Sequence, residues 1–160
     1  MKFRLLALLL TAISSSALAG PVACPDLSAV VKVAECPTEE ELRFTFNGYC
    51  SDNARIYGKP SDVCTDYRLY RKMKNTVLWE SKDGDFHGYV SCDISADKLK
   101  PMKPQGISVG PAGKGKMTRI ACNYPEGVTF TYRTHDACQA DNAAACKTDP
   151  AACSATCTPP

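Results

Sequence analysis

The sequence predicts a mainly β domain, an antiparallel β-sandwich or barrel-like fold of about six to eight short strands. We expect disulfides to staple this domain and a small Cys-rich appendage to follow it at the C-terminus. Three observations lead to this fold class. Ten cysteines follow an N-terminal stretch that is typical of a secretory signal. Several short segments alternate apolar and polar residues between turns that contain Gly or Pro. No segment has a helical pattern long enough for βαβ units.

The N-terminus has the organisation of a secretory signal peptide. Basic residues occur within residues 1–4, an apolar run covers residues 5–13, and an A-x-A cleavage pattern occupies residues 17–19. The run is shorter than the roughly 20 residues that cross a bilayer, so we expect no membrane span. The sequence therefore predicts an exported protein, periplasmic or extracellular, that starts at Gly20. An uncleaved anchor and a lipid on Cys24 are the less favoured alternatives.

Composition divides the chain into three parts. They are the signal (1–19), a β-rich disulfide-linked domain (20–135) and a Cys/Ala/Pro-rich tail (136–160). Without the two basic residues of the signal, 17 basic and 17 acidic side chains remain, so we expect no nucleic-acid partner. Residues 67–134 nevertheless hold 12 basic and six acidic residues. These cations would attract an anionic partner if they lie together; alternatively, they are solvated or face the acidic segment 20–66.

The even number of cysteines behind a signal indicates a framework of five disulfides, whose pairing the sequence leaves open. Structural zinc is the alternative, but the chain has no C-x-x-C spacing. The same observation argues against a thioredoxin-like oxidoreductase, and we expect neither a metal nor a cofactor. The cysteines are Cys24, Cys36, Cys50, Cys64, Cys92, Cys122, Cys138, Cys146, Cys153 and Cys157.

The clearest strand patterns form two hairpins. Thr76–Ser81 and Phe86–Ile94 are rich in apolar residues and flank an Asp-Gly turn. Met117–Tyr124 and Val128–Thr134 flank Pro125–Gly127 in the same manner. We expect each pair to form two adjacent antiparallel strands.

Three further segments are predicted strands. Leu42–Asn47 alternates strictly between apolar and polar residues and is predicted as a half-buried strand. Ser28–Val33 and Tyr67–Met73 are weaker strand candidates. Thr38–Glu41 could cap a helical turn, but a strand that begins at position 42 leaves little room for one.

Candidate binding residues are basic side chains of the middle segment and tyrosines expected to point away from the core. Exposed Tyr beside Arg and Lys is typical of recognition surfaces, although Tyr at the edge of a core is as common. The candidates are Tyr70, Arg71, Lys72, Tyr89, Lys98, Lys100, Lys103, Lys114 and Lys116. We therefore expect an exported, non-enzymatic binding module that recognises a protein or an anionic surface.

Two other functions stay open. Residues 98–115 contain three prolines and four glycines and predict a long exposed loop with a short strand at 107–109. An inhibitor or immunity-type protein could plug an enzyme with this loop. A small secreted hydrolase could use His87 or His135 as acid or base. The G-x-S-x-G motif around Ser108 lacks the helix that follows a hydrolase nucleophile, so no catalytic residue is assigned.

Overall fold

The computed structural model describes residues 20–53, 57, 62–111 and 117–159 as a mixed α/β fold with two antiparallel sheets. The larger sheet has six strands in the order β2-β3-β4-β7-β6-β5, and the smaller has three in the order β1-β9-β8. Neither sheet closes on itself. The prediction of a mainly β sandwich or barrel is therefore correct for the antiparallel pairing but wrong for the helices. The predicted signal, 1–19, lies outside the described residues.

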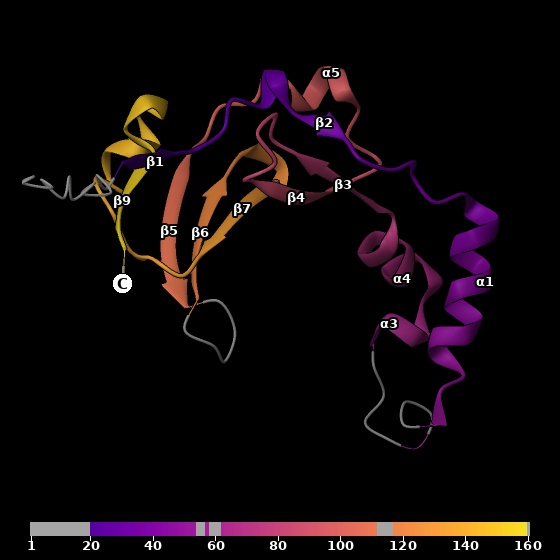
Figure 1. Ribbon diagram of the computed structural model, residues 1–160. Helices are drawn as coiled ribbons and strands as arrows, with labels where there is room; N and C mark the ends of the chain where they lie inside the picture. The colour runs from indigo at the N-terminus through magenta and orange to yellow at the C-terminus, as the bar shows by residue number, and fades with distance from the viewer. Residues whose placement is uncertain (1–19, 54–56, 58–61, 112–116, 160) are drawn as a thin grey trace, which may run out of the picture.

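Within the described residues, most of the α-helical structure lies in one stretch of the chain, residues 39–74. The strands are β1 Pro21–Ala23, β2 Val31–Lys32, β3 Thr76–Glu80, β4 His87–Ser91, β5 Gly106–Pro111, β6 Thr118–Asn123, β7 Thr129–Thr134, β8 Ala137–Ala140 and β9 Ser154–Thr158. The α-helices are α1 Glu39–Cys50, α3 Asp62–Thr65, α4 Tyr67–Lys74 and α5 Ala96–Leu99. Figure 1 shows α1, α3 and α4 gathered in one arm that extends away from the sheets. We call these three helices the helical arm.

Both predicted hairpins are confirmed. β3 and β4 pair along their whole length, with Thr76 opposite Ser91 at one end. β6 and β7 pair over six consecutive positions. The turn between β6 and β7 holds Glu126 and Gly127 at φ of 57° and 75°, a region that Gly enters freely and Glu enters at a cost.

The segment Leu42–Asn47, predicted as a strand, lies instead within α1. The Thr38 hydroxyl accepts a hydrogen bond from the backbone N–H of Glu41, and the Glu41 carboxylate accepts one from the backbone N–H of Thr38. This capping box satisfies two N–H groups at the start of the helix and favours helix over strand. In the helix, the alternating apolar residues face different sides: Leu42 is buried, whereas Phe44 is 79% exposed.

The two weaker strand candidates are corrected as well. Tyr67–Met73 belongs to α4, because the Asp66 carboxylate caps the helix by accepting from the backbone N–H of Arg68 at 2.9 Å. Within Ser28–Val33, a 3-10 turn precedes the short strand β2, so only Val31–Lys32 is extended in the sheet.

The predicted loop 98–115 is in part a folded element. The side chain of Leu99, at the end of α5, is fully buried, and Met102 also lies in the core. Residues 106–111 form β5, which pairs with β6 over six positions. Residues 112–116 lie outside the described residues.

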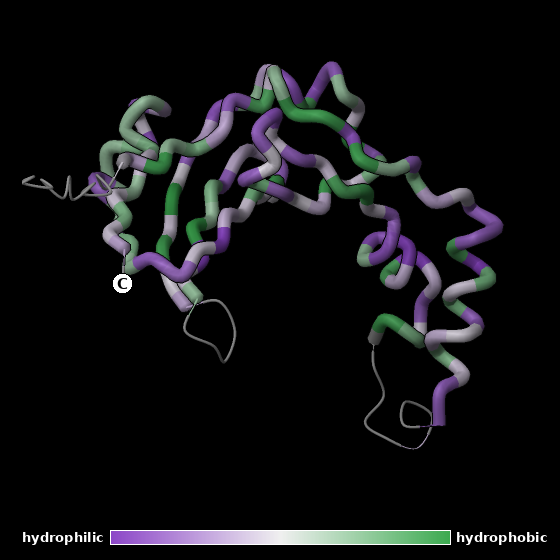
Figure 2. Tube along the Cα trace, in the orientation of Figure 1, coloured by the Kyte–Doolittle hydropathy of each residue, from purple (hydrophilic) through white to green (hydrophobic). Residues whose placement is uncertain are grey.

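One hydrophobic core extends from the larger sheet to the tail. Val90, Ile120 and Phe130 line the inner face of the larger sheet. Leu27 packs against them, and Ala155 of β9 belongs to the same core. The tail therefore lies against the domain. Figure 2 shows hydrophobic residues along β5 and β6, whereas hydrophilic residues are frequent on the helical arm.

All ten cysteines are paired, which confirms the predicted framework of five disulfides. The pairs are Cys24–Cys122, Cys36–Cys92, Cys50–Cys64, Cys138–Cys157 and Cys146–Cys153. The first two attach the N-terminal segment to the larger sheet, the third staples the helical arm, and the last two lie within the tail. Five disulfides indicate an oxidising, extracytoplasmic environment. No helix in the described part of the chain is long and apolar enough to cross a membrane.

Candidate functional site

An aromatic cluster holds the helical arm together. The ring of Phe46 on α1 contacts the rings of Tyr67 and Tyr70 on α4, with centroids 5.4 Å and 5.2 Å apart in edge-on geometry. The Cys50–Cys64 disulfide links the end of α1 to α3. Aromatic pairs of this kind stabilise beyond the area that they bury. The arm thus has an interior of its own.

Cations flank this aromatic cluster. The guanidinium of Arg43 lies 4.6 Å from the centroid of the Tyr67 ring, and the ammonium of Lys74 lies 5.5 Å from that of Tyr49. Burial of the Tyr67 hydroxyl, together with the neighbouring Glu39 carboxylate, raises the pKa of Tyr67. The phenol therefore stays neutral, so the ring presents an uncharged face to Arg43.

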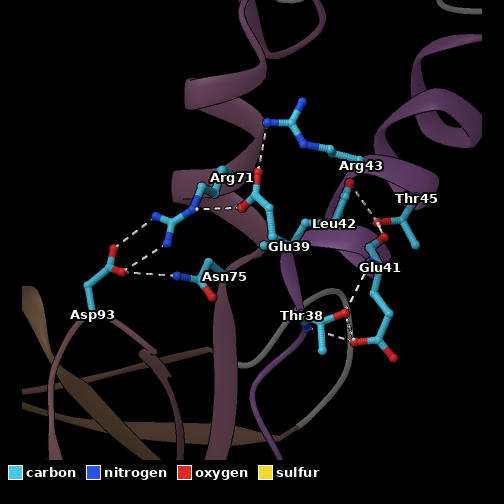
Figure 3. Close-up of polar contacts among 9 residues, drawn as sticks. All are labelled: Thr38, Glu39, Glu41, Leu42, Arg43, Thr45, Arg71, Asn75 and Asp93. Atoms are coloured by element: carbon cyan, nitrogen blue, oxygen red, sulfur yellow. Dashed lines mark hydrogen bonds and ion pairs between the residues drawn. The ribbon is translucent and has the colours of Figure 1, made fainter.

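Arg71 on α4 contacts both α1 and the larger sheet (Figure 3). Its Nε lies 3.4 Å from the Glu39 carboxylate on α1, and its Nη2 lies 3.3 Å from the carboxylate of Asp93, which follows β4. The buried Asn75 donates from Nδ2 to the same Asp93 at 3.1 Å. Hydrogen bonding to Asp93 raises the pKa of Arg71. The contacts of the Arg71 side chain therefore hold the helical arm against the larger sheet.

The side of α4 that faces away from α1 is exposed. Leu69 and Met73 are 43% and 40% exposed and lie one helical turn apart. Arg68 and Lys72 lie beside them on the same side of the helix. Lys72 forms no ion pair within the described ranges. We call Arg68, Leu69, Lys72 and Met73 the α4 stripe.

A pocket of about 540 Å³ lies between the α4 stripe and the end of β4. Three cations and two carboxylates line it, so its net charge is positive. Its lining residues are Arg68, Arg71, Lys72, Ser91, Asp93, Ile94 and Glu126. A groove of about 810 Å³ lies on the other side of the arm, along α1, where Leu42 and Tyr70 are among the lining residues.

The structure separates the predicted binding residues. Tyr70 is 2% exposed within the aromatic cluster, which corrects the expectation that its side chain lies on the surface. The expected outward orientation of Tyr89 is confirmed, since this side chain is 70% exposed. Arg71 is half-buried and paired, whereas Lys72 is exposed.

Apart from Lys72, the predicted lysines that the structure describes lie in or shortly after α5, a helix that Figure 1 shows apart from α4. Lys98 and Lys100 are exposed at α5. Lys103 lies 3.5 Å from the Asp26 carboxylate, so it faces the acidic first segment, as the alternative interpretation of the charge pattern expects. Lys114 and Lys116 lie outside the described residues. The binding role of all these lysines stays a prediction.

The two histidines lie on separate elements. His87 begins β4, and its Nε2 lies 2.9 Å from Nη1 of Arg133. His135 is exposed in the turn after β7. Ser108 is exposed in the middle of β5, and the residues directly after it, as far as Pro111, continue the strand. Within the described ranges, no group of three or more His, Cys, Asp or Glu could hold a metal ion.

Sequence analysis missed Leu69 and Met73. In a strand these two residues share a face with Arg71, and nothing singles them out. In a helix their spacing of four places them together as neighbours. A helical periodicity applied to Tyr67–Met73 places these two residues on the same side of the helix.

Comparison of the chain with protein-family models, with curated proteins and with solved structures finds no match.

Proposed function

We propose that this protein is an exported, non-enzymatic binding module that recognises an acidic protein through the α4 stripe. One observation carries the proposal: Leu69 and Met73 are exposed together, one turn apart, with Lys72 beside them. Single apolar residues at a surface are ordinary, but an adjacent pair of large ones on a helix is typical of a surface that a partner covers.

The chemistry of α4 supports a protein partner with a particular surface. Apolar anchors at positions i and i+4 are how a helix docks into an apolar groove of another protein. All four charged residues of α4 are basic, namely Arg68, Arg71, Lys72 and Lys74. A groove with carboxylates at its rim would complement this helix and would exclude basic proteins.

The rigidity of the helical arm also supports recognition. The Cys50–Cys64 disulfide, the aromatic cluster and the two ion pairs of Arg71 hold α4 before any partner arrives. A preformed surface loses less conformational entropy on binding than a flexible one. Preorganisation of this kind favours affinity from a small contact area.

The experiment compares partner capture by matched variants. The oxidised protein is immobilised, and acidic proteins retained from the extracytoplasmic fraction of the source cells are identified and titrated. We expect the double variant Leu69→Ser/Met73→Ser to bind the retained protein at least about tenfold more weakly, as loss of an anchor residue does. Phe44→Ser removes a still more exposed apolar residue, from α1, and serves as the control that leaves affinity unchanged.

Two results would overturn the proposal. One is that no acidic protein is retained above the level of a blank support. The other is that the double variant binds as tightly as the unchanged protein, or that Phe44→Ser alone weakens binding. Circular dichroism of each variant shows whether the helices are intact.

A further inference from the structure

A second surface, separate from the helical arm, lies on the outer face of the larger sheet. The register places Arg119 directly opposite Arg133, and His87 directly opposite Thr131. Residues two apart on a strand share a face, so Tyr89 joins them. The residues between them point the other way into the core. We call Arg119, Arg133, His87 and Tyr89 the basic sheet face.

Two guanidinium groups stand on this face, and no described residue provides a counterion for either. Opposed residues on one face of an antiparallel pair have Cβ atoms about 4.5–5.5 Å apart. Arg119 and Arg133 are both exposed, and neither forms an ion pair with any residue that the structure describes. Like charges directly opposite each other destabilise a sheet. An anion bound between the two side chains would remove this repulsion.

His87 holds one of these arginines in place without neutralising it. The distance from Nη1 of Arg133 to Nε2 of His87 is 2.9 Å. A guanidinium can only donate, so the His87 nitrogen accepts this hydrogen bond. The bond uses one N–H of Arg133 and leaves the others, with the full positive charge, for a ligand.

The neighbouring positions do not cancel this charge. Glu80 on β3 lies opposite His87 but forms no ion pair with either arginine within the described ranges. Ser108 on β5 lies on the same face as Arg119 and adds an exposed hydroxyl. The face therefore presents the two guanidinium groups and a neutral hydroxyl, while the Glu80 carboxylate lies on the far side of β4 from both arginines.

We infer that the basic sheet face binds a phosphate or sulfate group between the guanidinium groups of Arg119 and Arg133. The planar N–H fork of arginine matches pairs of oxygens on such a tetrahedral oxyanion. Six consecutive residue pairs between β6 and β7 fix the spacing of the two arginines before binding. Tyr89, 70% exposed and two positions from His87 on the side away from Arg133, offers an aromatic surface to a molecule long enough to extend past His87.

The test is a titration of the folded, oxidised protein with sodium phosphate and, separately, with sodium sulfate. Amide NMR chemical shifts are recorded at each concentration. Ionic strength is held constant, and a titration with sodium chloride is the reference. We expect saturable shifts confined to β4, β6 and β7. Arg119→Gln and Arg133→Gln should each weaken phosphate binding at least about tenfold, because each removes one bidentate partner. Lys147→Gln, at an exposed lysine of the tail, is the matched control and should bind like the unchanged protein.

The source of the group is distinguished by three probes: inorganic phosphate, glucose 6-phosphate, and phosphatidylcholine vesicles that contain phosphatidic acid. Tighter binding of glucose 6-phosphate that Tyr89→Ala abolishes supports a phosphorylated sugar as the source. Tighter binding of the vesicles supports a lipid headgroup, and equal binding of all three supports recognition of the anion alone. The inference is overturned if shifts do not saturate, or if both glutamine variants bind phosphate as tightly as the unchanged protein.

Discussion

The hydroxyl of Tyr124 donates a hydrogen bond to the main-chain carbonyl oxygen of Pro25, 2.6 Å away. The adjacent Cys24–Cys122 disulfide joins the same two segments, so two neighbouring links tie the N-terminal segment to the end of β6. Burial, with a smaller contribution from the carboxylate of Asp26, raises the pKa of Tyr124 well above its usual value. The phenol therefore stays protonated at neutral pH and donates this hydrogen bond.

Tyr124→Phe is expected to lower the free energy of unfolding by about 1–2 kcal/mol, because it leaves the partly buried Pro25 carbonyl without its donor. Urea unfolding with the disulfides intact measures this loss. Tyr89→Phe removes a hydroxyl from an exposed ring and is expected to change stability by less than about 0.5 kcal/mol. Equal stability of the two variants would show that the Tyr124 hydrogen bond contributes nothing.

Replacement by alanine is expected to change the free energy of unfolding in opposite directions at two glycines. A Cβ at Gly88 would lie 2.4 Å from the main-chain oxygen of Thr129, which cannot move without disturbing the pairing of β4 with β7. We expect Gly88→Ala to destabilise the fold by about 3 kcal/mol. At Gly48, inside α1, a Cβ meets nothing, so Gly48→Ala should stabilise the protein by about 0.5–1 kcal/mol. Thermal unfolding of both variants checks the signs, and destabilisation by Gly48→Ala would contradict the helix at that position.

Acid is expected to destabilise the fold through carboxylates whose charged form is hydrogen-bonded. The hydroxyls of Ser154 and Thr156 lower the pKa of Asp141, and the backbone N–H and hydroxyl of Thr38 lower the pKa of Glu41. A folded pKa below the unfolded one gives stability that is present above about pH 4 and is lost as the pH falls through the folded pKa.

The urea midpoint should therefore change little between about pH 7 and pH 5 and should fall below about pH 4. Asp141→Asn retains one acceptor but cannot titrate, so its midpoint should depend less on pH over the acid range. Thr38→Ala removes the cap of α1 and should lower stability at neutral pH by about 1 kcal/mol. A midpoint for Asp141→Asn that follows the same acid profile as the unchanged protein would rule out this contribution.

The Cys50–Cys64 disulfide is expected to stabilise the helical arm locally. The two cysteines are 14 residues apart, a separation for which loop closure contributes about 3 kcal/mol. In Cys50→Ser/Cys64→Ser, we expect faster hydrogen exchange in α1 and α4 and unchanged exchange in β6 and β7. Cys146→Ser/Cys153→Ser, in the tail, is the comparison that should leave the arm protected. Unchanged exchange in α1 and α4 would show that the aromatic cluster holds the arm without the disulfide.

The sequence predicts what is local in this fold. The β3–β4 and β6–β7 hairpins follow from turn residues between apolar runs, because such turns act over a few residues. The number of disulfides follows from the cysteine count and the signal. The pairing does not, because it depends on which distant segments meet, as when Cys24 meets Cys122.

The helical arm could not be predicted from the alternation of Leu42, Phe44 and Phe46. That pattern fits a strand, and it is the capping box of Thr38 and Glu41 that favours the helix. Phe44 belongs to the alternating apolar pattern, which predicts a buried side chain, yet in the helix its side chain is exposed. Local hydrogen bonding at a helix start thus outweighs apolar periodicity here.

Whether the exposure of a candidate site residue is predicted correctly depends on whether its segment is a strand or a helix. The exposure of Tyr89 follows correctly from strand alternation, whereas the outward orientation predicted for Tyr70 is wrong because this residue lies in a helix. Arg133 carries no signal in the sequence. Its position opposite Arg119 depends on the register between two strands, which only the folded sheet reveals.

The pairing of β1 with β9 has a practical consequence for handling the molecule. Pro21 lies opposite Thr156, so the two ends of the described chain run beside each other in one small sheet. Figure 1 shows this sheet at the opposite end of the molecule from the helical arm. A support, dye or fusion partner joined at either end would therefore leave α4 free. A short linker could join the two ends and yield a circular permutant that opens elsewhere in the chain.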